Sequence, residues 1–474
     1  MDKETEILDT PTPHLSHCLY RPQINNGKIR IMQNNNKQII VIGAGAAGMM
    51  AAGRAAECGA NVLLLEKTTR PGQKILISGN GRCNLTNSGD FDTFIAHYGT
   101  NGRFLYSAFD RFFREELMEF LQRYGVECKT EPDGKVYPVT DNARDIVRVF
   151  EKYLNDGKTA VRYGVTVNRI LTENNRITGV DTSAGIIPAS AVILAAGGAS
   201  HPQTGSTGDG YKLASALGHL VVGLRPGLVP LVIKETGRAV QMQGASLRNV
   251  RLTAFQKTVP EIDDALVPKA DAGRGLPGKP PKSPVVESRT GDAIITHFGL
   301  SGPIVLEMSL SIIDALEKGP VSVAFDLVPD KNRETLRKEL QDSLDRYSKR
   351  TYRNFLKELL PPKLAEPYVQ MTGIHPDKLA HQITAEERET LLSLMKSLRF
   401  EIKGAYSMAT AMVTAGGVSL KEIDPRTMAS RIVDGLYLCG EVMDIDAGTG
   451  GYNLQAAFST GYVAGESAAR NTIS

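Results

Sequence analysis

The chain has 474 residues, of which 42% are hydrophobic and 23% are charged, and its formal net charge is +3. A chain of this length exceeds what one hydrophobic core usually organises, so two or three domains are expected. The charge balance lacks the basic excess of proteins that bind a phosphate backbone, which makes nucleic acid a poor default partner.

Cysteine usage and hydropathy bear on where the protein works. Five cysteines are scattered without a Cys-x-x-Cys pair or a metal-like spacing, which favours a reducing compartment and argues against disulfides or a metal site. No stretch approaches the ~18 consecutive apolar residues of a membrane-spanning helix. Residues 1–6 carry acids where a signal peptide carries basic and apolar residues. We expect a cytoplasmic protein that does not enter a membrane.

The segment that begins at Gln38 predicts a βαβ unit. Residues 38–42 are a short buried strand, residues 43–48 a turn and residues 49–58 an alanine-rich helix. Residues 61–65 supply the next strand, and the unit ends at Glu66. This texture predicts a parallel α/β domain.

Residues 104–327 contain both helical and strand patterns of apolar residues. Apolar residues recur at helical spacing over residues 104–124, which predicts a core-facing helix. Residues 165–194 read as a β-meander that feeds a buried strand. Strand-like runs follow at residues 229–233 and 321–327. Between them, the Pro-, Lys- and Gly-rich residues 259–284 predict a mobile surface insertion of unassigned role.

The last third of the chain has helical patterns at residues 333–347, 352–360 and 385–398, then regains α/β character at residues 411–414 and 435–440. The expected division is a flexible leader (1–36), a nucleotide-binding domain in two parts (37–225 and 414–474), an inserted β-rich domain (226–330, returning at 398–413) and a helical subdomain (331–397).

Residues 43–48 fit the pattern G-x-G-x-x-G, and the strand and helix around them strengthen the match. Gly43 makes the tight turn, Gly45 lets the backbone reach a pyrophosphate, and Gly48 permits close helix packing. Glu66 can accept hydrogen bonds from the adenosine ribose, which favours FAD or NAD over NADP. A purely structural glycine turn is the alternative.

A second glycine-rich segment, residues 74–87, is dense in small and hydrogen-bonding residues. Arg82 could offset phosphate charge or lie over a flavin, while Ser78, Asn80, Asn84 and Asn87 could bind heteroatoms. An ordinary turn cluster is the alternative. Within it, Cys83 is read as a packed small residue rather than a redox thiol, because it has no partner cysteine nearby in sequence.

Two further strand-to-glycine segments have the same texture. Residues 195–200 follow a buried strand and precede residues 204–211, whose glycines open a helix. Residues 435–441 form a strand, and residues 448–455 enter the final helix. A helix that begins there would direct its positive end at the flavin N1/C2 region, where negative charge accumulates on reduction. Each segment alone could be a tight turn, but four concordant segments favour a dinucleotide site.

These motifs resemble the flavoprotein family that contains the bacterial 3-dehydro-bile acid Δ4,6-reductases and the aminoacetone oxidase-like proteins. The resemblance spans residues 38–470 and is carried by residues 43–48, 78–87, 296–303, 414–418 and 450–457. It implies a Rossmann-type FAD-binding domain of the two-dinucleotide-binding flavoprotein type, built from both chain ends, with an inserted β-barrel-like domain and a nested helical domain.

Motifs and resemblance together predict the cofactor contacts. They are Gly43, Gly45, Ala46, Ala47, Gly48, Glu66, Lys67, Lys74, Ser78, Asn80, Arg82, Cys83, Asn84, Val167, Gly197, Gly198, Gly208, Gly440, Glu441, Gly451, Asn453 and Leu454. Residues 207–211 also look like the succinate dehydrogenase and fumarate reductase flavoproteins, but the inserted region lacks the His/Arg pattern of a dicarboxylate site. Glu441 stands where such flavoproteins usually have Asp, which puts its contact in question.

The predicted activity is that of an FAD-dependent oxidoreductase acting on a small molecule. The leading hypothesis is reduction of a conjugated C=C bond, with NADH or NADPH as donor and hydride transfer through flavin N5. No second G-x-G-x-x-G unit is evident for the donor. Candidate proton donors are His297, Tyr406 and His201. His297 has the best claim because the matched motif surrounds it, and a structural or surface role is the alternative for each. An amine or amino-ketone oxidase using O2 and a non-catalytic flavin sensor remain alternatives, and the sequence indicates neither substrate nor oligomeric state.

Overall fold

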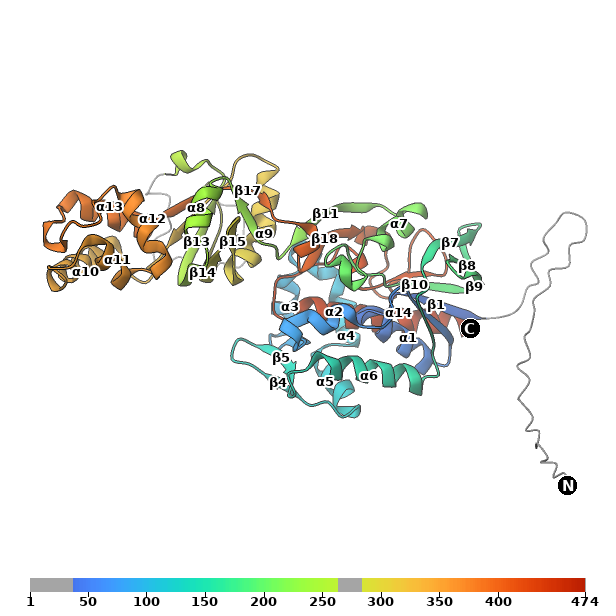
Figure 1. Ribbon diagram of the computed structural model, residues 1–474. Coiled ribbons are helices and arrows are strands. Elements are labelled where there is room, and N and C mark those ends of the chain that lie inside the picture. The colour runs from blue at the N-terminus through green and yellow to red at the C-terminus, as the bar shows by residue number, and fades with distance from the viewer. Residues whose placement is uncertain (1–36, 263–283, 474) are drawn as a thin grey trace, which may run out of the picture. The chain divides into compact units, whose positions relative to one another are not determined.

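Five parallel strands form the central sheet, in the order β19-β10-β1-β2-β6. Two of them, β10 and β1, lie side by side in Figure 1. Their bounds are β1 (Gln38–Ile42), β2 (Asn61–Glu66), β6 (Ala160–Tyr163), β10 (Ala191–Leu194) and β19 (Leu436–Leu438). The three middle strands are runs of buried Ile, Val, Leu and Ala, the pattern of a parallel sheet covered on both faces. A strand from near the C-terminal end therefore pairs beside strands from the N-terminal part of the chain.

The computed structural model describes residues 37–262 and 284–473. The predicted leader and most of the predicted insertion at residues 259–284 lie outside them. In the described part, residues 259–261 form a short 3-10 turn after β13. No helix among these residues is long and apolar enough to span a bilayer.

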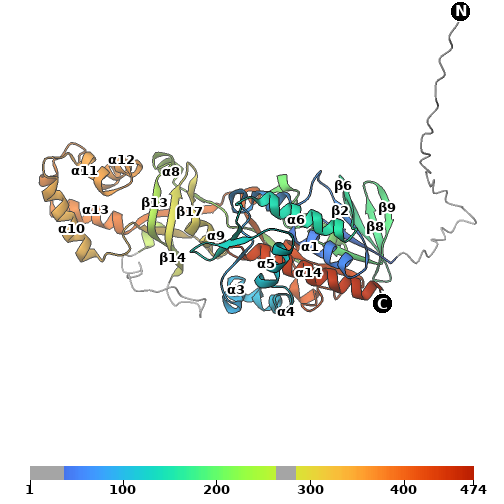
Figure 2. The ribbon, with the colours of Figure 1, turned by 90° about the horizontal axis from the view of Figure 1, so that it is seen from below.

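Helices cover one face of the central sheet. These are α1 (Ala46–Glu57), α6 (Ala143–Asp156) and α14 (Tyr452–Ile473), which lie side by side in both views (Figures 1 and 2). A three-stranded antiparallel sheet, β7 (Val167–Glu173), β8 (Arg176–Thr182) and β9 (Gly185–Pro188), packs against β10. The meander predicted over residues 165–194 is therefore present.

The stripe predicted as one helix over residues 104–124 is two helices. Phe112 has extended backbone, with φ −154°, and ends α4 (Tyr106–Arg111) before α5 (Arg114–Arg123) begins. Both helices still bury a phenylalanine in the core of this domain, Phe109 from α4 and Phe120 from α5. The other elements of this domain are α2 (Gln73–Ile77), β3 (Thr86–Asn87), α3 (Phe91–His97), β4 (Cys128–Thr130), β5 (Lys135–Pro138) and α7 (Asp209–Ala216).

Six antiparallel strands close a barrel in the order β12-β15-β14-β13-β16-β17. They are β12 (Leu231–Ile233), β13 (Ser246–Phe255), β14 (Val285–Ile295), β15 (Gly299–Ser301), β16 (Ser322–Asp326) and β17 (Leu398–Ala405). The long helix α9 (Pro303–Leu316) packs along β14, and the short helix α8 (Thr236–Gln241) precedes β13. The antiparallel pair of β11 (Val221–Gly227) and β18 (Val413–Val418) carries the chain into and out of the barrel.

Four helices are inserted between β16 and β17: α10 (Arg333–Arg346), α11 (Tyr352–Leu359), α12 (Ala365–Thr372) and α13 (Ala385–Lys396). Three of them match the predicted helical patterns, and α12 was not predicted. They share one hydrophobic core with the barrel, whereas the nucleotide-binding elements form another. The predicted fold class is thus confirmed: a Rossmann-type domain from both chain ends, an inserted barrel and nested helices. The residue boundaries drawn from the sequence stay a prediction.

Candidate functional site

A cavity of about 850 Å³ runs along the carboxyl edge of the central sheet. Its wall includes the turn after β1, the end of β2, the loop after α2, the turn after β10 and the segment from β19 into α14. Residues of the inserted barrel complete the wall around Ser301–Pro303. This edge is where parallel α/β sheets bind ligands, and its volume suits an extended cofactor and leaves room beside it.

The fingerprint turn is built for close approach of a ligand to backbone. Gly43 has φ +100°, and a Cβ there would lie 2.6 Å from the Ala195 carbonyl oxygen. A Cβ on Gly48 would overlap the Gly43 carbonyl oxygen, whereas a Cβ on Gly45 would meet nothing within 4 Å. Helix α1 begins after Gly45 without a side-chain cap. Its first-turn N–H groups therefore border the cavity as donors for an anion such as a pyrophosphate.

Glu66 ends β2 and lines the cavity at 9% exposure. Its Oε2 accepts from the backbone N–H of Ala44 at 2.7 Å, and its Oε1 accepts from that of Thr68 at 2.8 Å. Thr68 Oγ1 donates a second hydrogen bond to Oε1 at 2.8 Å. These bonds fix the carboxylate beside the fingerprint, and Oε2 keeps a lone pair for a ribose hydroxyl. The next residue, Lys67, is tied to Asp209 of α7 at 2.6 Å.

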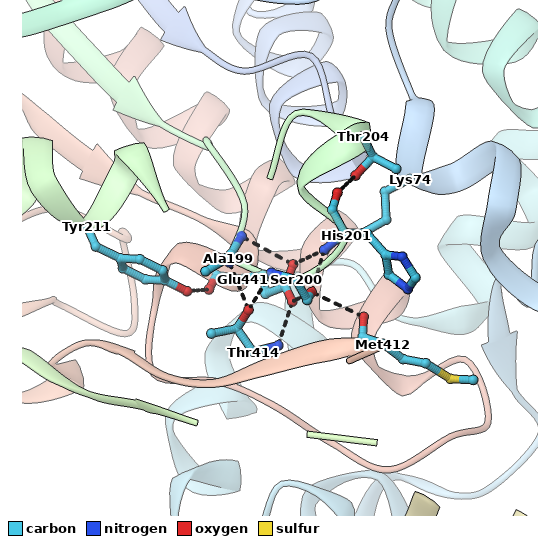
Figure 3. Close-up of polar contacts among 10 residues, drawn as sticks. Lys74, Ala199, Ser200, His201, Thr204, Tyr211, Met412, Thr414 and Glu441 are labelled. Carbon is cyan, nitrogen blue, oxygen red and sulfur yellow. Dashed lines mark hydrogen bonds and ion pairs between the residues drawn. The ribbon is translucent and has the colours of Figure 1, made fainter. Parts of the chain in front are cut away.

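Glu441 is the centre of a polar network that joins three chain segments (Figure 3). Its Oε2 accepts from Lys74 Nζ at 2.9 Å, and its Oε1 accepts from the Thr414 N–H at 2.9 Å. Lys74 Nζ also donates to Ser200 Oγ at 2.9 Å. A Cβ on Gly198 would lie 2.8 Å from the Glu441 carboxyl carbon. Glu441, which stands where similar flavoproteins usually have Asp, thus links the segments that form the cavity wall.

The second glycine-rich loop lines the cavity with Ser78, Asn80, Arg82 and Asn84. Arg82 pairs with Glu131 at 2.6 Å and lies over the Tyr137 ring at 3.9 Å. Its charge is therefore already matched by an acid. Cys83 is fully buried, and burial raises the pKa of its thiol to about 12. This environment agrees with a packing role for Cys83.

Asparagine side chains hold the loop that opens α14. In the amide orientation that satisfies both of its ends, Asn84 accepts from the Gly451 N–H at 2.9 Å. Asn87 Nδ2 donates to the Gly450 carbonyl at 3.0 Å, and Asn453 bonds both backbone groups of Ala447 at 2.8 and 2.9 Å. Asn84 and Asn87, expected to bind cofactor heteroatoms, are thus occupied in shaping the protein's own loop.

The three candidate proton donors are placed differently. His297 and Tyr406 do not belong to the cavity wall; Tyr406 is 45% exposed and stacks on Phe298 at 4.1 Å. His201 does line the cavity, and burial and the charge of Lys74 lower its pKa. Its Nδ1 lies 3.0 Å from Gln203 Nε2. If the amide nitrogen donates there, neutral His201 carries its proton on Nε2.

Most predicted cofactor residues lie together on this wall. They are Gly43, Gly45, Ala46, Ala47, Glu66, Lys67, Lys74, Ser78, Asn80, Arg82, Asn84, Val167, Gly197, Gly440, Glu441, Gly451, Asn453 and Leu454. Four of the predicted residues do not line the cavity: Gly48, Cys83, Gly198 and Gly208. Sequence reasoning missed an apolar wall formed by Leu228, Ile294, Leu306 and Met412. The motif at residues 296–303 was the one signal pointing to that region.

This parallel sheet, with its glycine turn, uncapped helix and acid after β2, defines a dinucleotide-binding protein of the Rossmann class. In the described residues, no group of three or more His, Cys, Asp or Glu is placed to hold a metal ion. The model of the HI0933-like protein Rossmann domain matches residues 37–467, and the chain belongs to that family. It is an FAD-dependent oxidoreductase.

Similar proteins include the 3-dehydro-bile acid delta(4,6)-reductase of Clostridium scindens, 33% identical over 91% of this chain and 99% of that protein. The ribosomal RNA dihydrouridine synthase of Escherichia coli is 30% identical over 89% of this chain and 96% of that protein. Among solved structures, 3-ketosteroid delta1-dehydrogenase from Sterolibacterium denitrificans has a TM-score of 0.47 at 14% identity, covering 92% of this chain and 100% of that one.

Proposed function

We propose that the protein reduces a C=C bond conjugated to a carbonyl in a small organic molecule, with NADH or NADPH as the electron donor. The observation that carries this proposal is that the cavity continues beyond the fingerprint to an apolar wall of Leu228, Ile294, Leu306 and Met412. A cavity with an apolar wall beside the cofactor, and with a few polar groups that can bind a carbonyl, suits such a substrate.

The names of the similar proteins support the same chemistry. By its name, a delta(4,6)-reductase reduces double bonds, and a dihydrouridine synthase makes the hydrogenated form of uridine. When bound, FAD supplies two-electron transfer between a donor and an acceptor at its N5 atom. This chain would have to orient the acceptor, exclude water and provide a proton.

We assign the following roles to its residues. The first turn of α1 at Gly45 binds the pyrophosphate, and Glu66 binds the adenosine ribose. The loop through Gly451 holds the flavin at the positive end of α14. The apolar wall excludes water from the acceptor. His201, the one of the three donor candidates on the cavity wall, would hydrogen-bond the acceptor carbonyl through Nε2–H.

The donor nicotinamide has no second fingerprint of its own in the sequence. We infer that it uses the same cavity as the acceptor, one after the other. Steady-state kinetics should then give parallel double-reciprocal lines, and the acceptor should inhibit competitively against NADH or NADPH. Intersecting lines would require a separate donor site.

The test is anaerobic mixing of the purified protein with NADH or NADPH while flavin absorbance near ~450 nm is followed. The reduced protein is then mixed with a panel of enones, with uridine or with O2, and re-oxidation of the flavin is followed. Bleaching followed by enone-dependent recovery supports the proposal. Recovery only with O2, accompanied by peroxide, indicates the oxidase alternative. Stable flavin without bleaching by any donor indicates a sensor.

Uridine in ribosomal RNA is a second candidate acceptor. Curated relatives from Escherichia coli and Haemophilus influenzae, each 30% identical, are named ribosomal RNA dihydrouridine synthases. The C5=C6 bond of uracil is conjugated to a carbonyl, so the same site chemistry applies. Dihydrouridine formed in unmodified ribosomal RNA, measured by mass spectrometry, would favour this acceptor and overturn the expectation that nucleic acid is not a partner. A cytoplasmic location fits either acceptor and stays a prediction.

A further inference from the structure

Helix α9 links the inserted barrel to the cavity. Pro303 and Leu306, in its first turn, line the cavity, and the helix packs along β14. The next residue, Glu307, contacts the nucleotide-binding domain. Its Oε1 accepts a hydrogen bond from Thr449 Oγ1 at 2.9 Å. Thr449 belongs to the loop that lines the cavity just before α14.

Glu307 is held in place from the barrel side. Its Oε2 accepts from Arg289 of β14 at 2.9 Å. Arg289 also contacts Glu287, which accepts from Ser311 one turn further along α9. The side chains of Glu307 and Arg289 are 31% and 45% exposed. Ion pairs with that exposure stabilise a fold little, so the arrangement matters through geometry.

The loop on the other side of this bond is intrinsically pliable. Gly450 and Gly451 have φ of +125° and +93°, in a region open mainly to glycine. Asparagine side chains hold the loop from the nucleotide-binding domain, as described above. Glu307 holds it from the barrel. Tyr452, the first residue of α14, stacks on His97 at 3.8 Å.

We propose that Glu307 is a positioning residue: by binding Thr449 it fixes the cofactor loop against the helix whose first turn forms part of the substrate wall. The relative position of the cofactor and the acceptor is thereby fixed, although the two are bound by different domains. This role rests on the FAD site and not on the identity of the acceptor proposed above.

The test compares Glu307→Ala, Thr449→Val and the double variant, with Glu307→Gln as the conservative change. Glu317→Ala, at the exposed end of α9, is the matched control. FAD is titrated into each apoprotein and its Kd is measured from flavin fluorescence, and the visible spectrum and midpoint potential are recorded. Thermal unfolding of the apoproteins monitors the fold, and Thr449→Val leaves the barrel network untouched.

We expect Glu307→Ala and Thr449→Val each to weaken FAD binding by about 10-fold, the size of one hydrogen bond to a charged group. The double variant should be no weaker than either single one, because both remove the same bond. Glu307→Gln, which keeps an acceptor for Thr449, should stay near the parent.

Three results would overturn the proposal: unchanged Kd and spectrum in Glu307→Ala, additive losses in the double variant, or a loss in Glu307→Gln as large as that in Glu307→Ala. The last result would assign the effect to the Arg289 ion pair. A parent protein that binds FAD but reduces no enone would contradict the proposed function, but it would not contradict the positioning role of Glu307.

Discussion

Close packing of α1 against α14 offers the sharpest test of the fold. These helices come from opposite ends of the chain, and glycines of α14 face backbone carbonyls of α1. A Cβ on Gly465 would overlap the Ala51 carbonyl oxygen and lie 3.0 Å from its Cα. Because these are backbone atoms, no side-chain rotation relieves the clash, and Gly465→Ala must push the helices apart.

Two effects oppose each other in this variant. Alanine favours a helix over glycine by about 1 kcal/mol, whereas overpacking a tight interior costs about 1–3 kcal/mol. With backbone as the obstacle we take the upper end and expect a net loss of about 2 kcal/mol. The control is Gly237→Ala in α8, where a Cβ would meet nothing within 4 Å. That change should be neutral or stabilise by a few tenths of a kcal/mol.

Urea unfolding at 25 °C with and without FAD measures both variants. Gly465→Ala should also bind FAD less tightly, because α14 begins at the cavity. If Gly465→Ala is as stable as the parent, or gains stability as Gly237→Ala does, the two helices are not packed as described.

Three other substitutions test residues on the cavity wall or next to it. Burial raises the pKa of Asp446 to about 6, so the folded protein favours the protonated carboxyl, and this stabilisation is lost as pH rises through 6. Asp446→Asn should therefore raise the unfolding free energy by about 2 kcal/mol at pH 8, and this gain should shrink toward pH 4. A gain in urea titrations that does not depend on pH would contradict the raised pKa of Asp446. Glu441→Gln leaves Lys74 without its carboxylate and should cost about 1–3 kcal/mol, partly restored by adding Lys74→Met; equal thermal stability of all three proteins would show that the pair is unimportant. Gly45→Ala should leave apoprotein stability within about 0.5 kcal/mol but weaken FAD binding at least about 10-fold, because its Cβ enters free cavity space; unaltered FAD titrations would remove Gly45 from the site.

The nucleotide-binding half was predictable because its signals are local. A buried strand, a glycine turn and a helix follow one another within residues 38–58, and Glu66 closes the unit. The long strands β13 and β14 escaped prediction because exposed polar and charged residues interrupt their apolar positions. Their barrel pairing, rather than local propensity, decides their structure.

Site details that depend on distant contacts could not be read from the sequence. Asn84 and Asn87 carry groups suited to a ligand, yet both bind a distant part of the chain. Asn87 bonds Gly450, which lies 363 positions away, and Asn84 bonds Gly451. His297 lies in a family motif, but its ring packs edge-on against Phe298 at 5.0 Å and does not line the cavity. The Glu307–Thr449 bond joins positions separated by 142 residues, so no local pattern marks it.

The pairing of β19 into the central sheet has a consequence for biosynthesis. During translation, β1, β2, β6 and β10 leave the ribosome well before β19 and α14, so the nascent nucleotide-binding domain has an unpaired edge and an uncovered helix face in the meantime. The barrel and its helices, contiguous over residues 231–405, can complete their core first. FAD capture must then be a late event, which makes this half of the protein the part most exposed to chaperones and proteases before its cofactor arrives.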